Sequence, residues 1–109
     1  KPSDAPFNRL SLAKKSQLVP ILKLINPLTS AQYGLLLDGW LRTAATDTAL
    51  VQLLKGINPL TSSTYGPLLD AWVRQPGSIQ QLVTILRSIN PTTVTGYGPL
   101  LDAWLSSRV

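Results

Sequence analysis

The sequence predicts an all-α protein of three tandem 32-residue helical hairpins, stacked as a short α-solenoid or a compact superhelical bundle. The first observation is that the chain matches itself twice at an offset of 32 residues, without a gap. The second is that apolar residues within each unit follow helical spacing and do not alternate. The third is a recurring Asn-Pro corner between two apolar stripes, at 26–27, 58–59 and 90–91.

The first helix of each hairpin is predicted from the stripe that precedes the corner. Leu50, Val51, Leu54 and Ile57 follow an i, i+1, i+4, i+7 pattern and share one face. In the third unit a capping box is expected just before this stripe, with serine at 78 and glutamine at 81. The helix is expected to end near the residue before the Asn-Pro corner, because a residue that precedes proline disfavours the α region.

The second helix is predicted from the stripe after the corner, over about 65–74, with equivalents near 33–42 and 97–107. Pro67 falls within the second of these stripes. If Thr64 is the N-cap, Pro67 is the third helical residue, and its missing N–H leaves no intrahelical hydrogen bond unmade. The predicted organisation is an N-terminal extension packed on the first repeat (1–15) and repeats 16–47, 48–79 and 80–109, forming one cooperative domain.

Composition excludes several kinds of chemistry. The 109 residues include no cysteine, methionine, histidine or glutamate, and only 14% are charged. Thiolate and imidazole ligands, disulfides and histidine-dependent nucleophiles are therefore absent. We predict a non-enzyme with no catalytic, cofactor-binding or metal-binding residue. The net charge of +5 permits anionic partners but arises from few acids more than from many bases.

The candidate interaction surface combines apolar and cationic positions. Pro20, Leu24 and Leu35 lie opposite the core stripes and give the first repeat extra apolar surface. An N-terminal segment with Phe7, Leu10 and Leu12 could cover this surface, or it could be a contact patch. Three cations recur at one repeat position and are expected to form a ladder, which suits a phosphate or lipid surface or a solvated edge: Lys23, Lys55 and Arg87.

Two further repeated sets favour structural roles. The aromatic residues on the leucine stripes are predicted core positions, with polar groups that could meet at repeat junctions: Tyr33, Trp40, Tyr65, Trp72, Tyr97 and Trp104. Asp38 and Asp70 precede Arg42 and Arg74 by four residues, which is the spacing of helical ion pairs.

We therefore expect a non-catalytic extracellular protein that acts in protein interaction or structural self-assembly. The alternatives are a carrier of a hydrophobic small molecule or lipid, and a basic amphipathic protein at an anionic membrane surface. Nucleic acid ranks last among the partners, because no aromatic residue alternates with the cations. A secreted location is expected because the chain begins with lysine and lacks an initiator methionine.

Overall fold

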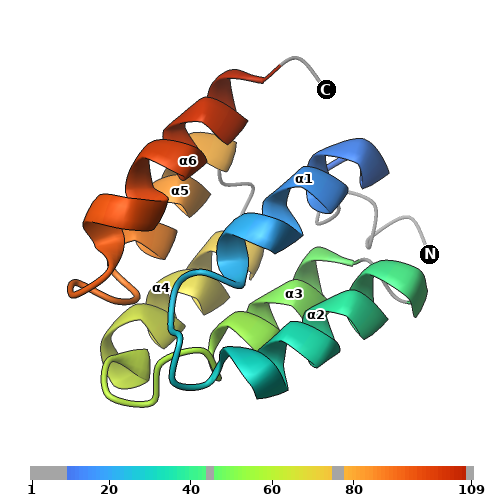
Figure 1. Cartoon of the computed structure of the whole chain (residues 1–109). Helices are drawn as coiled ribbons and strands as arrows, with labels where there is room; N and C mark the ends of the chain where they lie inside the picture. The colour runs from blue at the N-terminus through green and yellow to red at the C-terminus, as the bar shows by residue number, and fades with distance from the viewer. Residues whose placement is uncertain (1–9, 44–45, 75–77, 108–109) are drawn as a thin grey trace.

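The computed structural model describes residues 10–43, 46–74 and 78–107. These residues form six α-helices and no strand (Figure 1). In chain order the helices are α1 (Leu12–Leu22), α2 (Ser30–Thr43), α3 (Asp47–Leu54), α4 (Ser62–Arg74), α5 (Ile79–Arg87) and α6 (Val94–Ser106). The all-α prediction is confirmed for this part of the chain.

Side-chain hydroxyls begin α1, α3 and α5. Ser11, Thr46 and Ser78 are the N-caps, and each accepts a hydrogen bond from a backbone N–H three residues on. The capping box predicted at Ser78 is confirmed, because the Gln81 side chain also accepts from the Ser78 N–H at 3.0 Å. Such caps satisfy N–H groups that have no partner within the helix. α1 begins at Leu12, so its first turn lies in the segment expected to be an extension.

The same three helices end slightly earlier than the prolines alone predicted. α3 ends at Leu54, and the chain then tightens, with Ile57 N–H donating to the Leu54 carbonyl three residues back. Such i to i−3 bonds are common where an α-helix ends. The tightened turn carries Asn58 to the corner, and the first corner repeats this arrangement.

The second helices begin about three residues earlier than expected, so the prediction of Thr64 as N-cap is wrong. α4 starts at Ser62, and the Thr61 carbonyl accepts its first backbone bonds, from Thr64 and Tyr65. Pro67 is consequently an interior residue of α4 and removes one intrahelical bond. The earlier start has a physical cause, because the corner already turns the chain and supplies acceptors for the first N–H groups.

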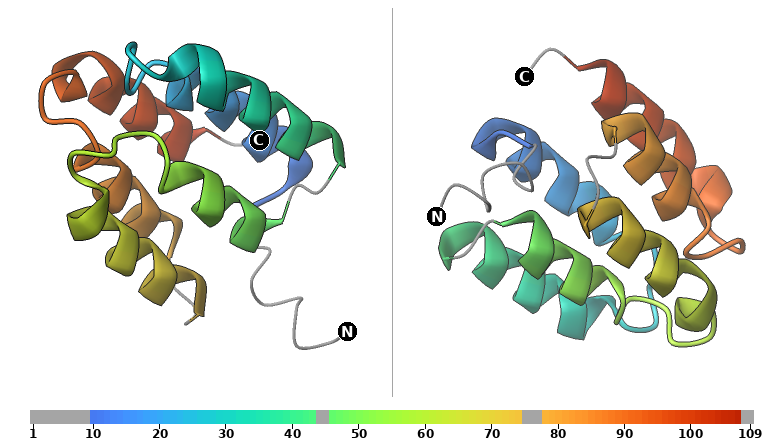
Figure 2. Two further views of the ribbon diagram at one scale, coloured as in Figure 1. Left: turned by 90° about the horizontal axis from the view of Figure 1, so that it is seen from below. Right: turned by 180° about the vertical axis from the view of Figure 1, so that it is seen from behind.

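Each helix packs on its neighbours in the chain, and α6 also packs on α1 (Figures 1 and 2). Hydrogen bonds cross this last junction: Asn90 Nδ2 donates to the Ile25 carbonyl at 2.9 Å, and Trp104 Nε1 donates to the Lys14 carbonyl at 2.9 Å. The order of contacts therefore closes on itself. An open stack would leave the first and last helices apart.

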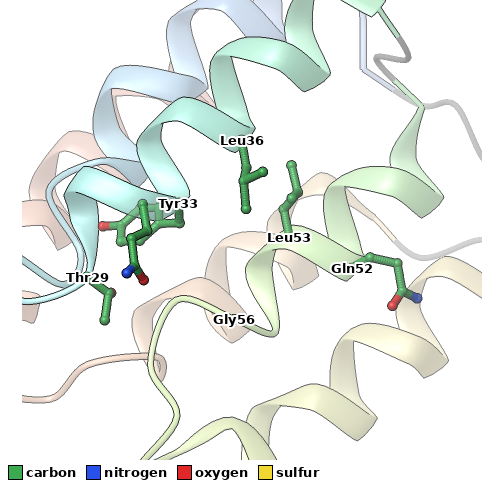
Figure 3. A pocket seen from close by; sticks show the side chains of 7 residues that line it. Thr29, Tyr33, Leu36, Gln52, Leu53 and Gly56 are labelled. Carbon is green, nitrogen blue, oxygen red and sulfur yellow. The ribbon is translucent and has the colours of Figure 1, made fainter.

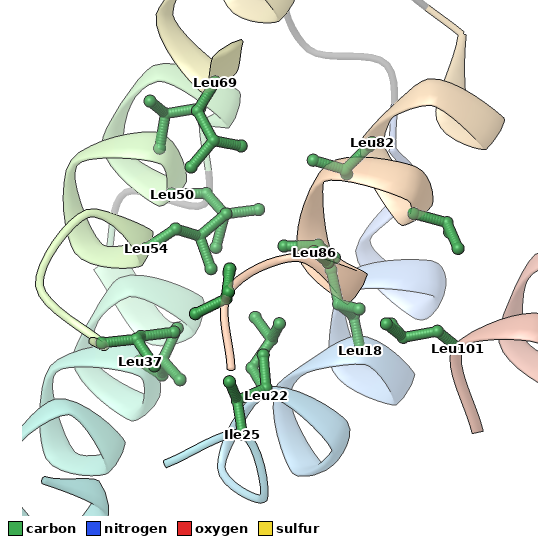
Figure 4. Packing of buried hydrophobic residues seen from close by; sticks show 14 of the residues in the cluster. Leu18, Leu22, Ile25, Leu37, Leu50, Leu54, Leu69, Leu82, Leu86 and Leu101 are labelled. Atoms are coloured by element: carbon green, nitrogen blue, oxygen red, sulfur yellow. The ribbon is translucent and has the colours of Figure 1, made fainter. Parts of the chain in front are cut away.

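One apolar core fills the centre of this arrangement. Leucines from α1, α3 and α5 point toward one another and meet leucines from the second helices (Figure 4). The fully buried leucines at equivalent repeat positions are Leu18, Leu22, Leu50, Leu54, Leu82 and Leu86, joined by Leu37, Leu69 and Leu101. The hydrophobic effect scales with apolar area removed from water, so no single hairpin could bury this surface alone.

Candidate interaction surface

The three tyrosines lie in the core, where each joins the two helices of one hairpin. The Tyr65 hydroxyl donates to the Leu54 carbonyl at 2.5 Å and accepts from the Asn58 N–H at 3.2 Å. Tyr33 and Tyr97 make the equivalent pairs of bonds. Burial raises the pKa of all three phenols, and the backbone bonds lower it in part. These hydroxyls therefore hold the two helices of each hairpin together and are not presented to a ligand.

The asparagine of each corner binds the next corner around the molecule. Asn26 Nδ2 donates to the Ile57 carbonyl at 2.8 Å, and Asn58 Nδ2 donates to the Ile89 carbonyl at 2.8 Å. Thr29 Oγ1 also donates to the Ile57 carbonyl at 2.8 Å. The corners are thus tied to one another by buried polar groups, which makes them rigid features of the surface.

The tryptophans are also buried, and their indoles bond at the opposite end of the helices. Trp40 and Trp72 donate to the carbonyls of Thr46 and Ser78, the N-caps of the following helices. Trp104 donates to the Lys14 carbonyl, which stands at the same repeat position. The six aromatic residues that the sequence placed in the core are all at most 4% exposed.

Two lysines at the start of α1 are buried, which the sequence analysis missed. Lys14 Nζ donates to the carbonyls of Trp104 at 2.6 Å and Ser107 at 2.8 Å, at the end of α6. Lys15 lies 5.8 Å from the Trp40 ring centre, and burial lowers its pKa while the nearby Asp47 raises it in part. One signal was available, since lysine at 14 replaces the capping Thr46 and Ser78 of the other repeats.

The predicted ladder cations each face an aspartate across the hairpin. Lys23 Nζ lies 2.8 Å from Asp38 Oδ1, and Lys55 Nζ lies 2.5 Å from Asp70 Oδ1. Arg87 pairs with Asp102 in the same way. The predicted partners of Asp38 and Asp70, four residues later in the same helices, are replaced by these cations. The ladder therefore presents balanced charge to the solvent.

The apolar positions proposed for contact are on the surface. Pro20, Leu24 and Leu35 are exposed. Of the segment expected to cover them, Phe7 lies outside the described residues, Leu10 is buried, and Leu12 is exposed.

The most exposed leucines were not singled out from the sequence. Leu28 and Leu60 follow the first two Asn-Pro corners and are 92% and 90% exposed. Their backbone N–H groups donate to the Asn26 and Asn58 side chains at 3.1 and 3.2 Å, so each corner fixes the backbone of its leucine. They belong to neither helical stripe, and periodicity therefore gave no signal for them. The third corner carries Thr92 at this position.

A shallow pocket of ≈ 150 Å³ lies between α2 and α3, beside these corners (Figure 3). Leu36 and Leu53 point toward each other across it. The full lining is Thr29, Gln32, Tyr33, Leu36, Gln52, Leu53 and Gly56. The repeat positions that correspond to Gly56 hold Leu24 and Ser88, so the missing side chain of Gly56 opens this junction in particular.

Among the described residues, no cluster of three or more metal-ligating side chains is found. None of the described helices combines the length and apolar character needed to cross a bilayer. Comparisons with family models, curated proteins and solved structures find no match to the chain.

Proposed function

We propose that this chain is a non-catalytic, extracellular helical-repeat protein, in which three tandem hairpins serve protein binding or structural self-assembly. The observation that supports this most strongly is the pair of corner leucines, Leu28 and Leu60. Each side chain is almost fully exposed, while the backbone N–H of each residue donates to a buried asparagine. Covering a large apolar side chain that is exposed to water lowers the free energy, so both residues favour contact with a partner.

A carrier of a hydrophobic small molecule or lipid is the second candidate, and the pocket between α2 and α3 is where such a ligand would bind. Its volume of ≈ 150 Å³ is small beside typical ligand pockets of about 300–1,000 Å³. The pocket is also open to solvent and not enclosed. It suits a protruding side chain of a partner better than an enclosed ligand.

An anionic membrane surface or a nucleic acid receives less support. Binding to either depends on cations that are available to phosphate groups. Lys23, Lys55 and Arg87 already pair with aspartates of the same hairpins.

Native mass spectrometry of the full chain from its natural source tests the proposed function. The expected result is an oligomer or a complex with another macromolecule, whose populated fraction rises with protein concentration. A monomer that carries an adduct of small-molecule mass would instead support the carrier. Salt-sensitive binding to vesicles of phosphatidylglycerol and phosphatidylcholine would support the membrane role. A bare monomer that binds nothing from its native surroundings would overturn the proposal.

A further inference from the structure

We propose that the corner leucines and the adjacent pocket form a self-complementary surface through which two copies of this chain make a symmetric dimer. This inference rests on the proposed function and names its partner, a second copy. We define the corner patch as Leu28, Leu60 and the pocket that contains Leu36, Leu53 and Gly56. In the dimer, Leu28 of each copy enters the pocket of the other, and Leu60 covers the rim.

Leu28 and the pocket lie side by side on one face of the molecule. Thr29 lines the pocket and directly follows Leu28. The Thr29 hydroxyl also bonds to the Ile57 carbonyl, which brings the first corner against the second corner and Leu60. A two-fold interface requires one patch to carry both complementary features, because each copy offers the same surface.

The repeats provide an internal comparison. The third corner has Thr92 where the first two have leucine, and the other junctions have Leu24 and Ser88 where this one has Gly56. Projecting leucines on both flanks and an open pocket therefore occur together only at the α2–α3 junction, within the described residues. The fold does not require this difference, since closely similar backbone turns form at all three corners.

The leucines are suited to binding because their backbone is already ordered. Asn26 accepts from Leu28 and donates to the next corner, and Asn58 does the same for Leu60. Binding through a preorganised corner avoids much of the entropy cost of ordering a loop.

Charge and area are both compatible with a second copy. Two chains of +5 repel each other, but the pocket is lined only by neutral residues. Lys55, beside Gly56, is paired with Asp70, and Arg42 and Arg74 lie in the last turns of α2 and α4, away from the corners. A stable contact covers about 800 Å² of each partner, about an eighth of the 6047 Å² surface. That area is less than a third of the surface, the share of one of the three repeats.

Sedimentation velocity from about 1 μM to about 1 mM tests the dimer, with variants borrowed from the sister repeats. Leu28→Thr with Leu60→Thr installs the residue of the third corner and is expected to weaken dimerisation at least about tenfold. Gly56→Leu installs the residue of the first repeat and fills the pocket, with a similar loss. A Cβ at Gly56 comes no closer than 3.6 Å to the Leu53 carbonyl oxygen, so the substitution fits the backbone.

Leu12→Thr is the matched control, because Leu12 is an exposed leucine at the far end of α1. It is expected to leave dimerisation unchanged, and 0.5 M salt is expected to weaken the wild-type dimer little. Circular dichroism of each variant checks that it is folded.

A wild-type chain that stays monomeric at 1 mM would overturn the dimer. So would corner variants that dimerise as well as the wild type. A monomer that nevertheless forms a native complex with a different macromolecule would retain the proposed function and reject the dimer, so the two failures are distinguishable.

Discussion

The Tyr65 hydroxyl is the clearest case of a single group that holds two helices together. It donates to the Leu54 carbonyl and accepts from the Asn58 N–H, and the side chain is fully buried. Tyr65→Phe leaves both backbone groups without this partner, so we expect a loss of about 1–3 kcal/mol in unfolding free energy. Urea denaturation measures it. Thr84→Ala, at an exposed hydroxyl, is the control and should change stability by less than about 0.5 kcal/mol. Equal losses in the two variants would contradict this role.

The same hydroxyls predict how stability depends on alkaline pH. The folded chain holds the pKa of Tyr33, Tyr65 and Tyr97 above the ordinary 10.0 because the phenols are buried. Above pH 10 the unfolded chain releases these protons first, so stability present at lower pH is lost as pH rises. Each phenol contributes a slope of up to about 1.4 kcal/mol per pH unit.

Lys15 acts in the opposite sense over a different range. Burial lowers its pKa below 10.5, so stability gains as pH rises from that lowered pKa toward 10.5. Of these two effects, only that of the tyrosines continues above pH 10.5. Urea midpoints measured between pH 9 and pH 12 should therefore fall steeply at the upper end. Tyr65→Phe should reduce that final slope by about a third, and an unchanged slope would count against the assignment.

Residue-scale prediction from the sequence succeeded where repetition and periodicity coincide. The tyrosine and tryptophan positions lie on the leucine stripes, and all are buried. The polar partners of Asp38 and Asn26 could not be predicted from the sequence. Asp38 pairs with Lys23 at the end of α1, and Asn26 donates to the Ile57 carbonyl of the next corner. Leu28 gave no signal, since it stands between two stripes.

At the scale of the element, α4 contains an interior proline that costs one backbone hydrogen bond. Pro67 is the sixth residue of the helix, so the Ser63 carbonyl has no N–H four residues on. α2 forms the same helix with Leu35 at this position, which shows that proline is not needed. Pro67→Ala should therefore stabilise the protein by about 1 kcal/mol, within the cost of about 3 kcal/mol for an interior proline. Thermal denaturation measures the gain, and Pro99→Ala in α6 should behave alike. A lower melting temperature in both variants would show that the prolines assist the fold.

Element boundaries were the weaker part of the sequence analysis, and the prolines explain why. Reading Pro67 as a first-turn residue placed the start of α4 about three residues late. The corner before it supplies the missing acceptor, the Thr61 carbonyl, and so allows helix to begin before the proline. Such a contribution depends on the turn geometry and leaves no trace in hydrophobic periodicity.

At the scale of the whole molecule, the junction between α6 and α1 copies the other two without a covalent link. Trp104 bonds to the Lys14 carbonyl as Trp72 bonds to that of Ser78. Lys14 adds two bonds to the end of α6 and lies 5.0 Å from the Trp104 ring centre. The repeat predicted equivalent units, but closure could not be predicted, because it depends on the angle between neighbouring hairpins.

If packing and hydrogen bonds hold one junction, they should hold another after the chain is cut there. A circular permutant that joins the two ends and opens the link at 75–77 is therefore expected to fold, since Ser107 already contacts Gln17. It should be less stable than the native order. The opened junction, between α4 and α5, has Ser78 at the position where the junction between α6 and α1 has Lys14, and so lacks the bonds that the lysine makes.

Grafting residues 11–14 in place of 75–78 supplies that lysine and should restore roughly 1.5–3 kcal/mol, as expected for hydrogen bonds to a charged group. Circular dichroism and urea denaturation compare the two permutants with the native order. If both permutants are unfolded, the fold depends on the native covalent links, and contacts between helices do not suffice to hold a junction together. If both fold with equal stability, Lys14 contributes nothing to closure. If both permutants fold and the grafted one is more stable, the bonds of Lys14 compensate for the absence of a covalent link at a junction.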